Sequence, residues 1–135
     1  MYKVTKQIYF CYGHRLMDYD GPCRHPHGHN SRVDIELAGE VTDKSHILFK
    51  FEGLKEVVQG WIDRELDHKM LLRKDDPLVA VMKQLDEPCY LFETNPTAEA
   101  IARLIYDYSK SKGLPVSEIR VWEGETSYAS YSRES

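Results

Sequence analysis

Two long stretches of alternating side chains constrain the fold of this chain more than any other feature of its sequence. In residues 2–13 almost every second position is apolar, and the same alternation returns in residues 27–37. A period of two is typical of a β-strand with one buried face. We therefore expect a strand that ends near His14, a loop with glycine and proline over residues 15–26, and a second strand after it.

The pattern changes to helical spacing in the middle of the chain. Residues 42–46 (TDKSH) look like a hairpin turn and residues 47–51 (ILFKF) like a return strand. Apolar positions three and four residues apart then run through residues 54–66, which predicts an amphipathic helix. A short helix is expected after Asp76 and Pro77.

A second long helix is expected to open at Asn95, with Asn95 as N-cap, Pro96 in the first helical position and Gly113 at the C-terminal cap. Two short strands, at residues 119–123 and 128–131, follow it. The sum is an α+β fold, an antiparallel sheet packed on two main helices, in one domain spanning residues 1–135.

Composition narrows the class of protein. The net charge is −4 and no segment concentrates Lys or Arg, so nucleic acid is not an expected partner. No apolar run approaches the roughly 20 residues of a membrane span, and the N-terminal residues lack a signal peptide's apolar stretch. We therefore expect no membrane partner and a cytoplasmic location. Three cysteines, an odd number, favour reduced thiols over a disulfide framework.

Histidines are crowded into the segment CRHPHGHN, residues 23–30. His27 and His29 are two residues apart at a strand start, so both imidazoles project from one face and can meet one ion. His14, at the end of the preceding strand, is the natural third ligand. Three histidines would leave the fourth position of Zn²⁺ open, as in catalytic zinc sites. The alternative is a polar loop with unrelated histidines; His25 is not an expected ligand, because Pro26 interrupts the strand beside it.

The three thiols differ in their surroundings. Cys23 lies four residues before His27, where it could bind a metal or act as a base, although an inert loop cysteine is the simpler interpretation. Cys11 and Cys89 are interpreted as structural.

Two acidic positions are candidates for chemistry. Asp67 and His68 can form a carboxylate–imidazole relay if the fold turns them together. Glu123 stands in an apolar strand, so its carboxylate needs a partner, either an Arg or Lys or the paired N–H groups of a ligand.

Taken in order, these motifs resemble those of the 6-pyruvoyltetrahydropterin synthase / 6-carboxytetrahydropterin synthase family, over nearly the whole chain. The resemblance rests on Phe10-Cys11-Tyr12-Gly13-His14-Arg15-Leu16, Cys23 separated by three residues from His27-Gly28-His29, Leu66-Asp67-His68, Asn95-Pro96-Thr97-Ala98-Glu99 and Trp122-Glu123. It implies the tunnelling fold, with sheets that join into a barrel in a homo-hexamer, a dimer of trimers whose sites are shared between subunits.

The resemblance also implies roles for individual residues. Zinc would be bound by His14, His27 and His29. Cys23 would be the catalytic thiol, and Asp67 with His68 the second proton-transfer group.

Substrate binding is assigned in the same way. Glu123 would anchor the pyrimidine ring of a pterin, with Thr97 lining the pocket. Glu125 is a rival, but Glu123 has the expected spacing of eight residues to Tyr131.

The implied substrate is 7,8-dihydroneopterin triphosphate. Three residues separate Cys23 from the HGH motif, as in the queuosine-pathway branch, whereas the pyruvoyl branch has five. We therefore expect 6-carboxy-5,6,7,8-tetrahydropterin synthesis with release of acetaldehyde and triphosphate. The alternatives are 6-pyruvoyltetrahydropterin synthesis and a pterin-binding paralogue without turnover. Lys50, Leu72 and a longer segment at residues 81–93 depart from the family pattern.

Overall fold

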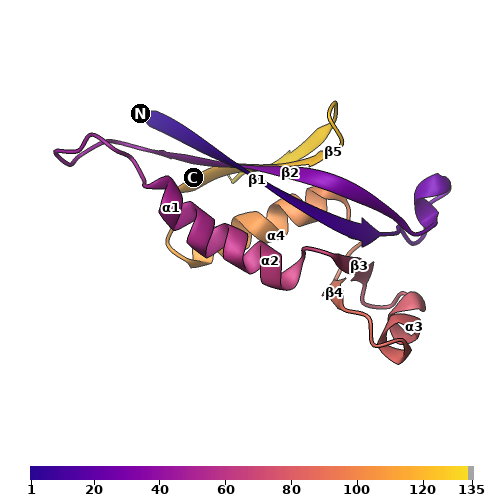
Figure 1. The fold of residues 1–135 in the computed structure, drawn as a ribbon. Coiled ribbons are helices and arrows are strands. Elements are labelled where there is room, and N and C mark those ends of the chain that lie inside the picture. The colour runs from indigo at the N-terminus through magenta and orange to yellow at the C-terminus, as the bar shows by residue number, and fades with distance from the viewer. Residues whose placement is uncertain (134–135) are drawn as a thin grey trace.

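A long antiparallel hairpin forms the centre of the fold. The computed structural model describes residues 1–133 and pairs β1 (Tyr2–His14) with β2 (His27–Gly39) along their full lengths, from Tyr2 opposite Gly39 to His14 opposite His27. Figure 1 shows these two strands crossing the top of the molecule. The alternation that predicted both strands is therefore confirmed, including their ends at the histidines.

The sheet is larger and more varied than the sequence predicted. Its order is β4-β3-β1-β2-β5-β6, and β3 runs parallel to both β1 and β4 while the other pairs are antiparallel. The four outer strands are β3 (Lys69–Arg73), β4 (Cys89–Phe92), β5 (Val116–Glu123) and β6 (Tyr128–Tyr131). The predicted antiparallel sheet is confirmed in three of its pairings, and the two parallel pairings add to it because β3 and β4 flank a crossover helix, α3 (Leu78–Gln84), and such a connection joins parallel strands.

Two helical segments cover one face of the sheet (Figure 1). The first runs continuously through α1 (Phe51–Leu54), a π-helical turn (Lys55–Gln59) and α2 (Gly60–Glu65). The second is α4 (Ala98–Ser111), and the left-handed Gly113 (φ 79°) follows it as expected. Both long helices and the short α3 after Pro77 are confirmed.

The N-cap of α4 differs from the prediction. Thr97, not Asn95, caps the helix, and its hydroxyl oxygen accepts a hydrogen bond of 3.1 Å from the Ala100 N–H. The Asn95 side chain instead exchanges two hydrogen bonds with the backbone of Met17. Asn95 therefore fastens the loop after His14 to the start of α4.

The predicted return strand at residues 47–51 is wrong. Residues 40–50 form no strand, and Phe51 begins α1. β2 lies between β1 and β5, so it has no free edge for another strand here. Leu48 and Phe49 pack against the hydrophobic core instead, which accounts for the apolar character of the segment.

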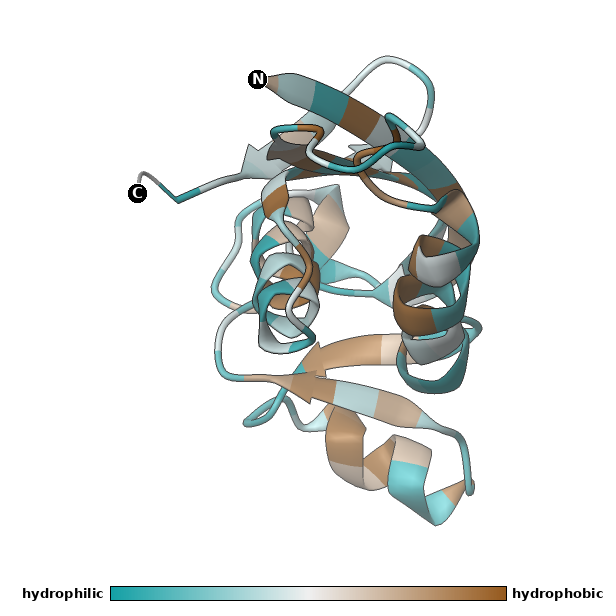
Figure 2. Ribbon diagram, turned by 90° about the vertical axis from the view of Figure 1, so that its left-hand side faces the viewer, coloured by the Kyte–Doolittle hydropathy of each residue, from teal (hydrophilic) through white to brown (hydrophobic). Residues whose placement is uncertain are grey.

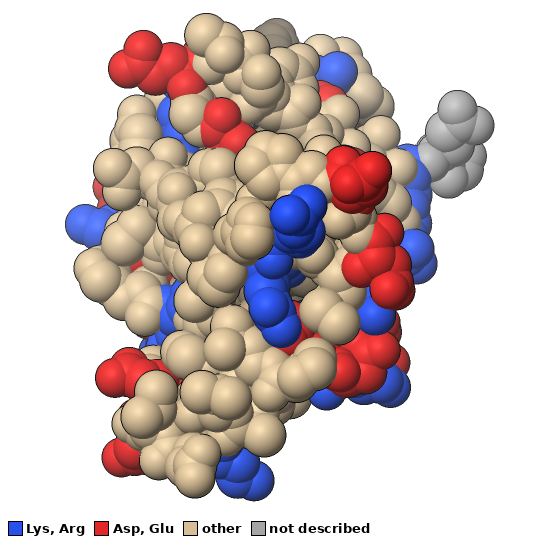
Figure 3. All heavy atoms as spheres, turned by 90° about the vertical axis from the view of Figure 1, so that its right-hand side faces the viewer, with Lys and Arg blue, Asp and Glu red and all other residues tan. Residues whose placement is uncertain are grey.

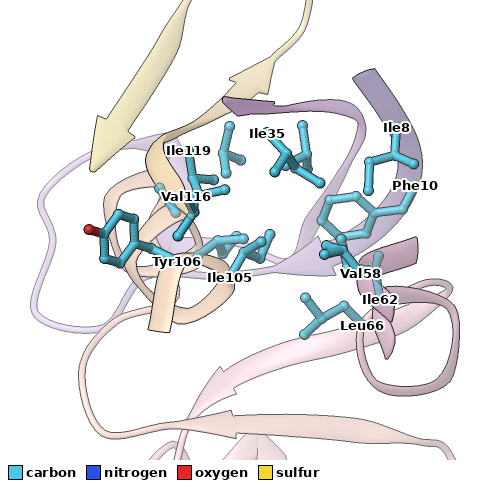
Figure 4. Packing of buried hydrophobic residues seen from close by; sticks show 14 of the residues in the cluster. Ile8, Phe10, Ile35, Val58, Ile62, Leu66, Ile105, Tyr106, Val116 and Ile119 are labelled. Atoms are coloured by element: carbon cyan, nitrogen blue, oxygen red, sulfur yellow. The ribbon is translucent and has the colours of Figure 1, made fainter. Parts of the chain in front are cut away.

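The core lies between the sheet and the helices α2 and α4. The inward faces of β1, β2 and β5 meet apolar side chains from both helices, as Figure 4 shows for Phe10, Ile35, Ile62, Ile105 and Ile119. The β3–α3–β4 unit, at the bottom of Figure 2, is also largely hydrophobic, but α3 buries none of its residues.

Within residues 1–133, no helix combines the length and apolar character that a membrane crossing would require.

Candidate metal centre and the residues around it

Three histidines converge where β1 ends and β2 begins. His14 lies opposite His27 in the hairpin, and His29 lies opposite Tyr12, so all three imidazoles occupy the same face of the two strands. One nitrogen from each ring lies within 4.8 Å of the other two, and the Nε2 atoms of His14 and His29 are 3.2 Å apart. The structure thus brings together the three residues that the sequence selected as ligands.

Backbone carbonyls orient two of these rings. With the proton assigned to Nδ1, His14 donates to the carbonyl of Pro96 at 2.7 Å, and His27 donates to the carbonyl of His25 at 2.7 Å. Each Nε2 is then left as the free donor atom, the arrangement usual for metal-binding histidines. His25 contributes its backbone, and its own ring is not part of the cluster.

The donor set fits a zinc ion. His14 is buried, and burial, together with the charges of His27 and His29, lowers the pKa of its imidazole. Metal binding requires neutral imidazole, so this shift favours the binding-competent form. Two nitrogens bound tetrahedrally at about 2.0–2.1 Å from one ion lie roughly 3.3 Å apart, close to the observed 3.2 Å.

Tyr12 is a neighbour of this cluster that sequence reasoning missed. Its ring meets the His14 ring edge-on, with centroids 5.1 Å apart, and lies 5.6 Å from the His29 ring. Burial, and secondarily the charge of Glu123, raise the pKa of the Tyr12 hydroxyl. The signal was available, because Tyr12 and His14 share one face of β1.

A second group of polar side chains lies on the opposite face of β1. The Cys11 thiol is 3.4 Å from Nε2 of His68, and Nδ1 of His68 bonds Oδ2 of Asp67 at 2.8 Å. The Cys11 N–H donates to the other oxygen of Asp67 at 2.9 Å. Asp67 and His68 therefore form the relay geometry suggested by the sequence, with Cys11 as an unforeseen third member.

Electrostatics and backbone geometry mark this second group as well. Burial would raise the pKa of the Asp67 carboxyl, but hydrogen bonds from the Cys11 N–H and the His68 ring outweigh it and lower the pKa. His68 has φ 60°, and its N–H donates to the Cys11 carbonyl at 2.7 Å. A left-handed histidine is uncommon and marks a position that the surrounding structure holds firmly.

The remaining sequence-selected residues do not belong to the histidine cluster. Cys23 occupies a short 3₁₀ turn (Pro22–Arg24), and its thiol is not among the atoms that meet His14, His27 and His29. Thr97 follows Pro96, the residue whose carbonyl holds His14.

Glu123 ends β5 opposite Ser31. It borders a hollow of about 150 Å³ beside Ala98 and Glu99, at the start of α4. Thr97, its expected partner in substrate binding, directly precedes Ala98 in the chain.

A larger cavity, of about 620 Å³, opens beside the ends of β1 and β2. Its lining includes Cys11, His27, His29, His68 and Met70. Figure 3 shows this end of the molecule, where acidic and basic side chains stand close together around uncharged surface.

The three departures from the family pattern lie in different places. The segment 81–93 supplies Met82, Glu87 and Pro88 to the larger cavity. Leu72 is fully buried, and Lys50 precedes α1 beside a separate hollow. Of the three, only the segment 81–93 borders the cavity next to the histidines.

Comparison with known proteins agrees with the resemblance seen in the sequence. Residues 3–134 match the family model of 6-pyruvoyl tetrahydropterin synthase. A 6-carboxy-5,6,7,8-tetrahydropterin synthase of Rickettsia felis is 37% identical over 107 residues, which cover 76% of this chain and 75% of that protein. The enzyme of the same name from Haemophilus influenzae is 29% identical, with 97% and 99% of the two chains covered.

Solved structures share the fold. An uncharacterized protein of Wolinella succinogenes superposes with a TM-score of 0.80 at 23% identity, over 98% of each chain. The 6-pyruvoyl tetrahydropterin synthase of Caenorhabditis elegans superposes with a TM-score of 0.76 at 21% identity, over 98% of this chain and 96% of that one. At such identities, the likeness establishes the architecture alone.

Proposed function

Because the chain belongs to the 6-pyruvoyl tetrahydropterin synthase family, we propose that it is a zinc-dependent 6-carboxy-5,6,7,8-tetrahydropterin synthase of queuosine biosynthesis. In this reaction, 7,8-dihydroneopterin triphosphate and water yield the carboxylated pterin, acetaldehyde and triphosphate. The observation that carries the proposal is the convergence of three histidine donors beside a cavity. The names of the relatives and the spacing of Cys23 from the HGH motif favour the carboxy product.

Zinc would be held by His14, His27 and His29. When bound, it would supply a Lewis acid that polarises the hydroxyl and carbonyl oxygens of the substrate side chain. The Pro96 carbonyl fixes the His14 ring through Nδ1, so Nε2 is presented to the ion.

Proton transfer falls to two groups of this chain. Cys23 would take or return one proton as its thiol. His68 would move the other through Nε2, because its Nδ1–H is already directed to Asp67. The carboxylate therefore sets both the tautomer and the orientation of the ring.

Glu123 and Thr97 would bind the pterin. A carboxylate can accept two parallel hydrogen bonds from the adjacent N–H groups of an aminopyrimidine ring. The hollow beside Glu123 and the start of α4 offers a position for that ring.

A site built from these parts favours assembly of several chains. The histidine cluster and the Asp67–His68 relay form separate groups, on opposite faces of β1. A homo-hexamer, a dimer of trimers with sheets joined into a barrel, would let the relay of one copy serve the metal of another. We further propose that the enzyme works in the cytoplasm, where its three free thiols stay reduced.

Product analysis tests the proposed function. Zinc-loaded protein is incubated with 7,8-dihydroneopterin triphosphate, and the products are identified by mass spectrometry. Acetaldehyde with 6-carboxytetrahydropterin supports the proposal, whereas 6-pyruvoyltetrahydropterin without acetaldehyde would assign the chain to the other branch. Absence of any turnover would indicate a pterin-binding paralogue.

A cysteine pair separates catalysis from folding. Cys23→Ala should abolish turnover while zinc content stays unchanged, because the thiol is not one of the proposed ligands. Cys89→Ala is the matched control, since Cys89 begins β4 away from the histidine cluster. Equal losses in both variants would remove the assigned role of Cys23.

A further inference from the structure

The hydroxyl of Tyr12 lacks a hydrogen-bond partner although it is buried. Tyr12 is only 3% exposed, and within residues 1–133 its Oη is the one fully buried side-chain oxygen or nitrogen without a partner. Other buried polar side chains are bonded: Ser109 donates to the Ile105 carbonyl at 2.7 Å, and Ser31 to the Trp122 carbonyl at 2.7 Å. Since burying an unbonded hydroxyl is costly, this exception needs a physical reason.

The surroundings of the ring show what the hydroxyl can reach. Tyr12 stacks on Phe10, with centroids 5.3 Å apart, and its ring contacts those of His14 and His29. The Glu123 carboxylate acts on the hydroxyl through its charge and through a weak side-chain contact, but this contact does not reach the geometry of a full hydrogen bond. Tyr12 therefore stands between the three-histidine cluster and the carboxylate at the end of β5.

We propose that Tyr12 is a ligand-binding residue whose O–H donates to an acceptor atom, a carbonyl oxygen or ring nitrogen, of the heterocycle bound between the histidine cluster and Glu123. This inference rests on the proposed function and extends it to a residue that the sequence analysis left unassigned. A tyrosine hydroxyl is protonated at neutral pH, so it supplies a neutral donor. Glu123 accepts from the N–H groups of such a ring, and Tyr12 completes the recognition by donating to one of its acceptors.

The arrangement explains why the protein tolerates the orphan hydroxyl. An unsatisfied donor that pairs only when ligand binds is an energetic cost in the free protein and a gain in the complex. Removing it should therefore leave the free protein at least as stable and weaken the complex selectively.

The test compares Tyr12→Phe with Tyr9→Phe in the full-length, zinc-loaded protein. Tyr9 is the matched control because it lies on the same strand, faces the other side and is 67% exposed. The readouts are zinc content, melting temperature without ligand, and affinity for pterin-6-carboxylate from quenching of its fluorescence. We expect Tyr12→Phe to keep its zinc, to melt no lower than the unaltered protein, and to bind the pterin about tenfold more weakly.

The other outcomes each overturn a defined part of the reasoning. Equal pterin affinity in Tyr12→Phe and the unaltered protein would reduce Tyr12 to a packing residue. If Tyr12→Phe lost zinc but kept its pterin affinity, the hydroxyl would support the metal site and not the pterin, and the inference would also be refuted. If the unaltered protein bound no pterin and turned over no substrate, the proposed function itself would fail, and the inference with it.

Discussion

Replacement of Asp76 by Asn should destabilise the protein strongly, although Asp76 lies outside the candidate site. The Asp76 carboxylate is buried and accepts from Arg15 through both Nε, at 2.7 Å, and Nη2, and from the Leu78 N–H at 2.7 Å. It thereby joins the segment just after His14 to the start of α3. Asn can keep the two bonds that end on Oδ1, but its amide group no longer accepts from Arg15 Nε and it cannot neutralise the guanidinium.

The size of the effect follows from the exposure of the two partners. Removing one member of a fully buried pair costs about 3–5 kcal/mol. The Arg15 side chain is 24% exposed, so water recovers part of its solvation and we expect about 2 kcal/mol. At about 2.1 cal/mol/K per residue, the unfolding entropy of 135 residues converts this loss into a fall in Tm of about 7 °C.

The same pair predicts a pH dependence. The Arg15 guanidinium lowers the pKa of the Asp76 carboxyl below its unfolded value. The stabilisation is therefore fully present above about pH 4 and is lost as the pH falls through the folded pKa. The difference in Tm between the unaltered protein and the Asp76→Asn variant should be largest at pH 7 and should become smaller toward pH 3.5.

Thermal unfolding at fixed protein concentration measures both effects, with Asp75→Asn as the control. Asp75 is adjacent and also pairs with an arginine, Arg73, but its side chain is 62% exposed, so its removal should shift Tm by no more than about 2 °C. A Tm of the Asp76→Asn protein as high as that of the Asp75→Asn protein would refute the reasoning. An equal difference in Tm between the unaltered protein and the Asp76→Asn variant at pH 7 and at pH 3.5 would also refute it.

Three further substitutions test the site and the core. His14→Ala should remove stoichiometric zinc, measured by elemental analysis, whereas His25→Ala should retain it because only its backbone carbonyl orients a ligand. Glu123→Gln should keep zinc but bind pterin-6-carboxylate at least tenfold more weakly, since it loses a charged double acceptor; unchanged affinity would contradict the anchoring role. Ile105→Ala, at a fully buried position, should lower the free energy of unfolding in urea by about 2–5 kcal/mol, and a loss below 1 kcal/mol would show that the core collapses around the cavity.

The hairpin was predictable from sequence because its signal is local. Alternation in β1 and β2 fixes which side chains face the core, and the buried faces then fix the register. His14 ends one alternating segment and His27 begins the next, so the structure pairs them directly. The convergence of the three candidate ligand histidines follows from the same rule.

The parallel strands were not predictable in this way. The apolar runs of β3 (KMLLR) and β4 (CYLF) are short, and nothing within them specifies a partner. The pairing of β3 with β1 and of β4 with β3 depends on where the first helix ends and on the crossover through α3, which are properties of the whole fold. The error at residues 47–51 has the converse cause: the local pattern suited a strand, but β5 occupies the edge of β2.

Sequence reasoning missed two residues near the candidate site, Tyr12 and Cys11, and only the first could have been placed from a local pattern. Tyr12 shares a face with His14, so alternation alone could have placed it beside the candidate ligands. Cys11 could not have been found from local pattern, because its partners Asp67 and His68 lie more than fifty positions away in sequence. Its contact with His68 depends on the parallel pairing of β1 and β3, the feature that the sequence concealed.

The end of the hairpin has two unlike faces, and alternation produces both. His14 with His27, and Tyr12 with His29, place rings on one face, while the pair between them, Gly13 with Gly28, presents no side chains to the other. That bare pair lines the larger cavity, and a Cβ on Gly28 would come within 3.2 Å of the Tyr12 carbonyl oxygen. One pair of strands therefore builds a donor cluster on one face and leaves the other face bare at Gly13 and Gly28, and the larger cavity beside this pair is lined by His68 as well as by His27 and His29.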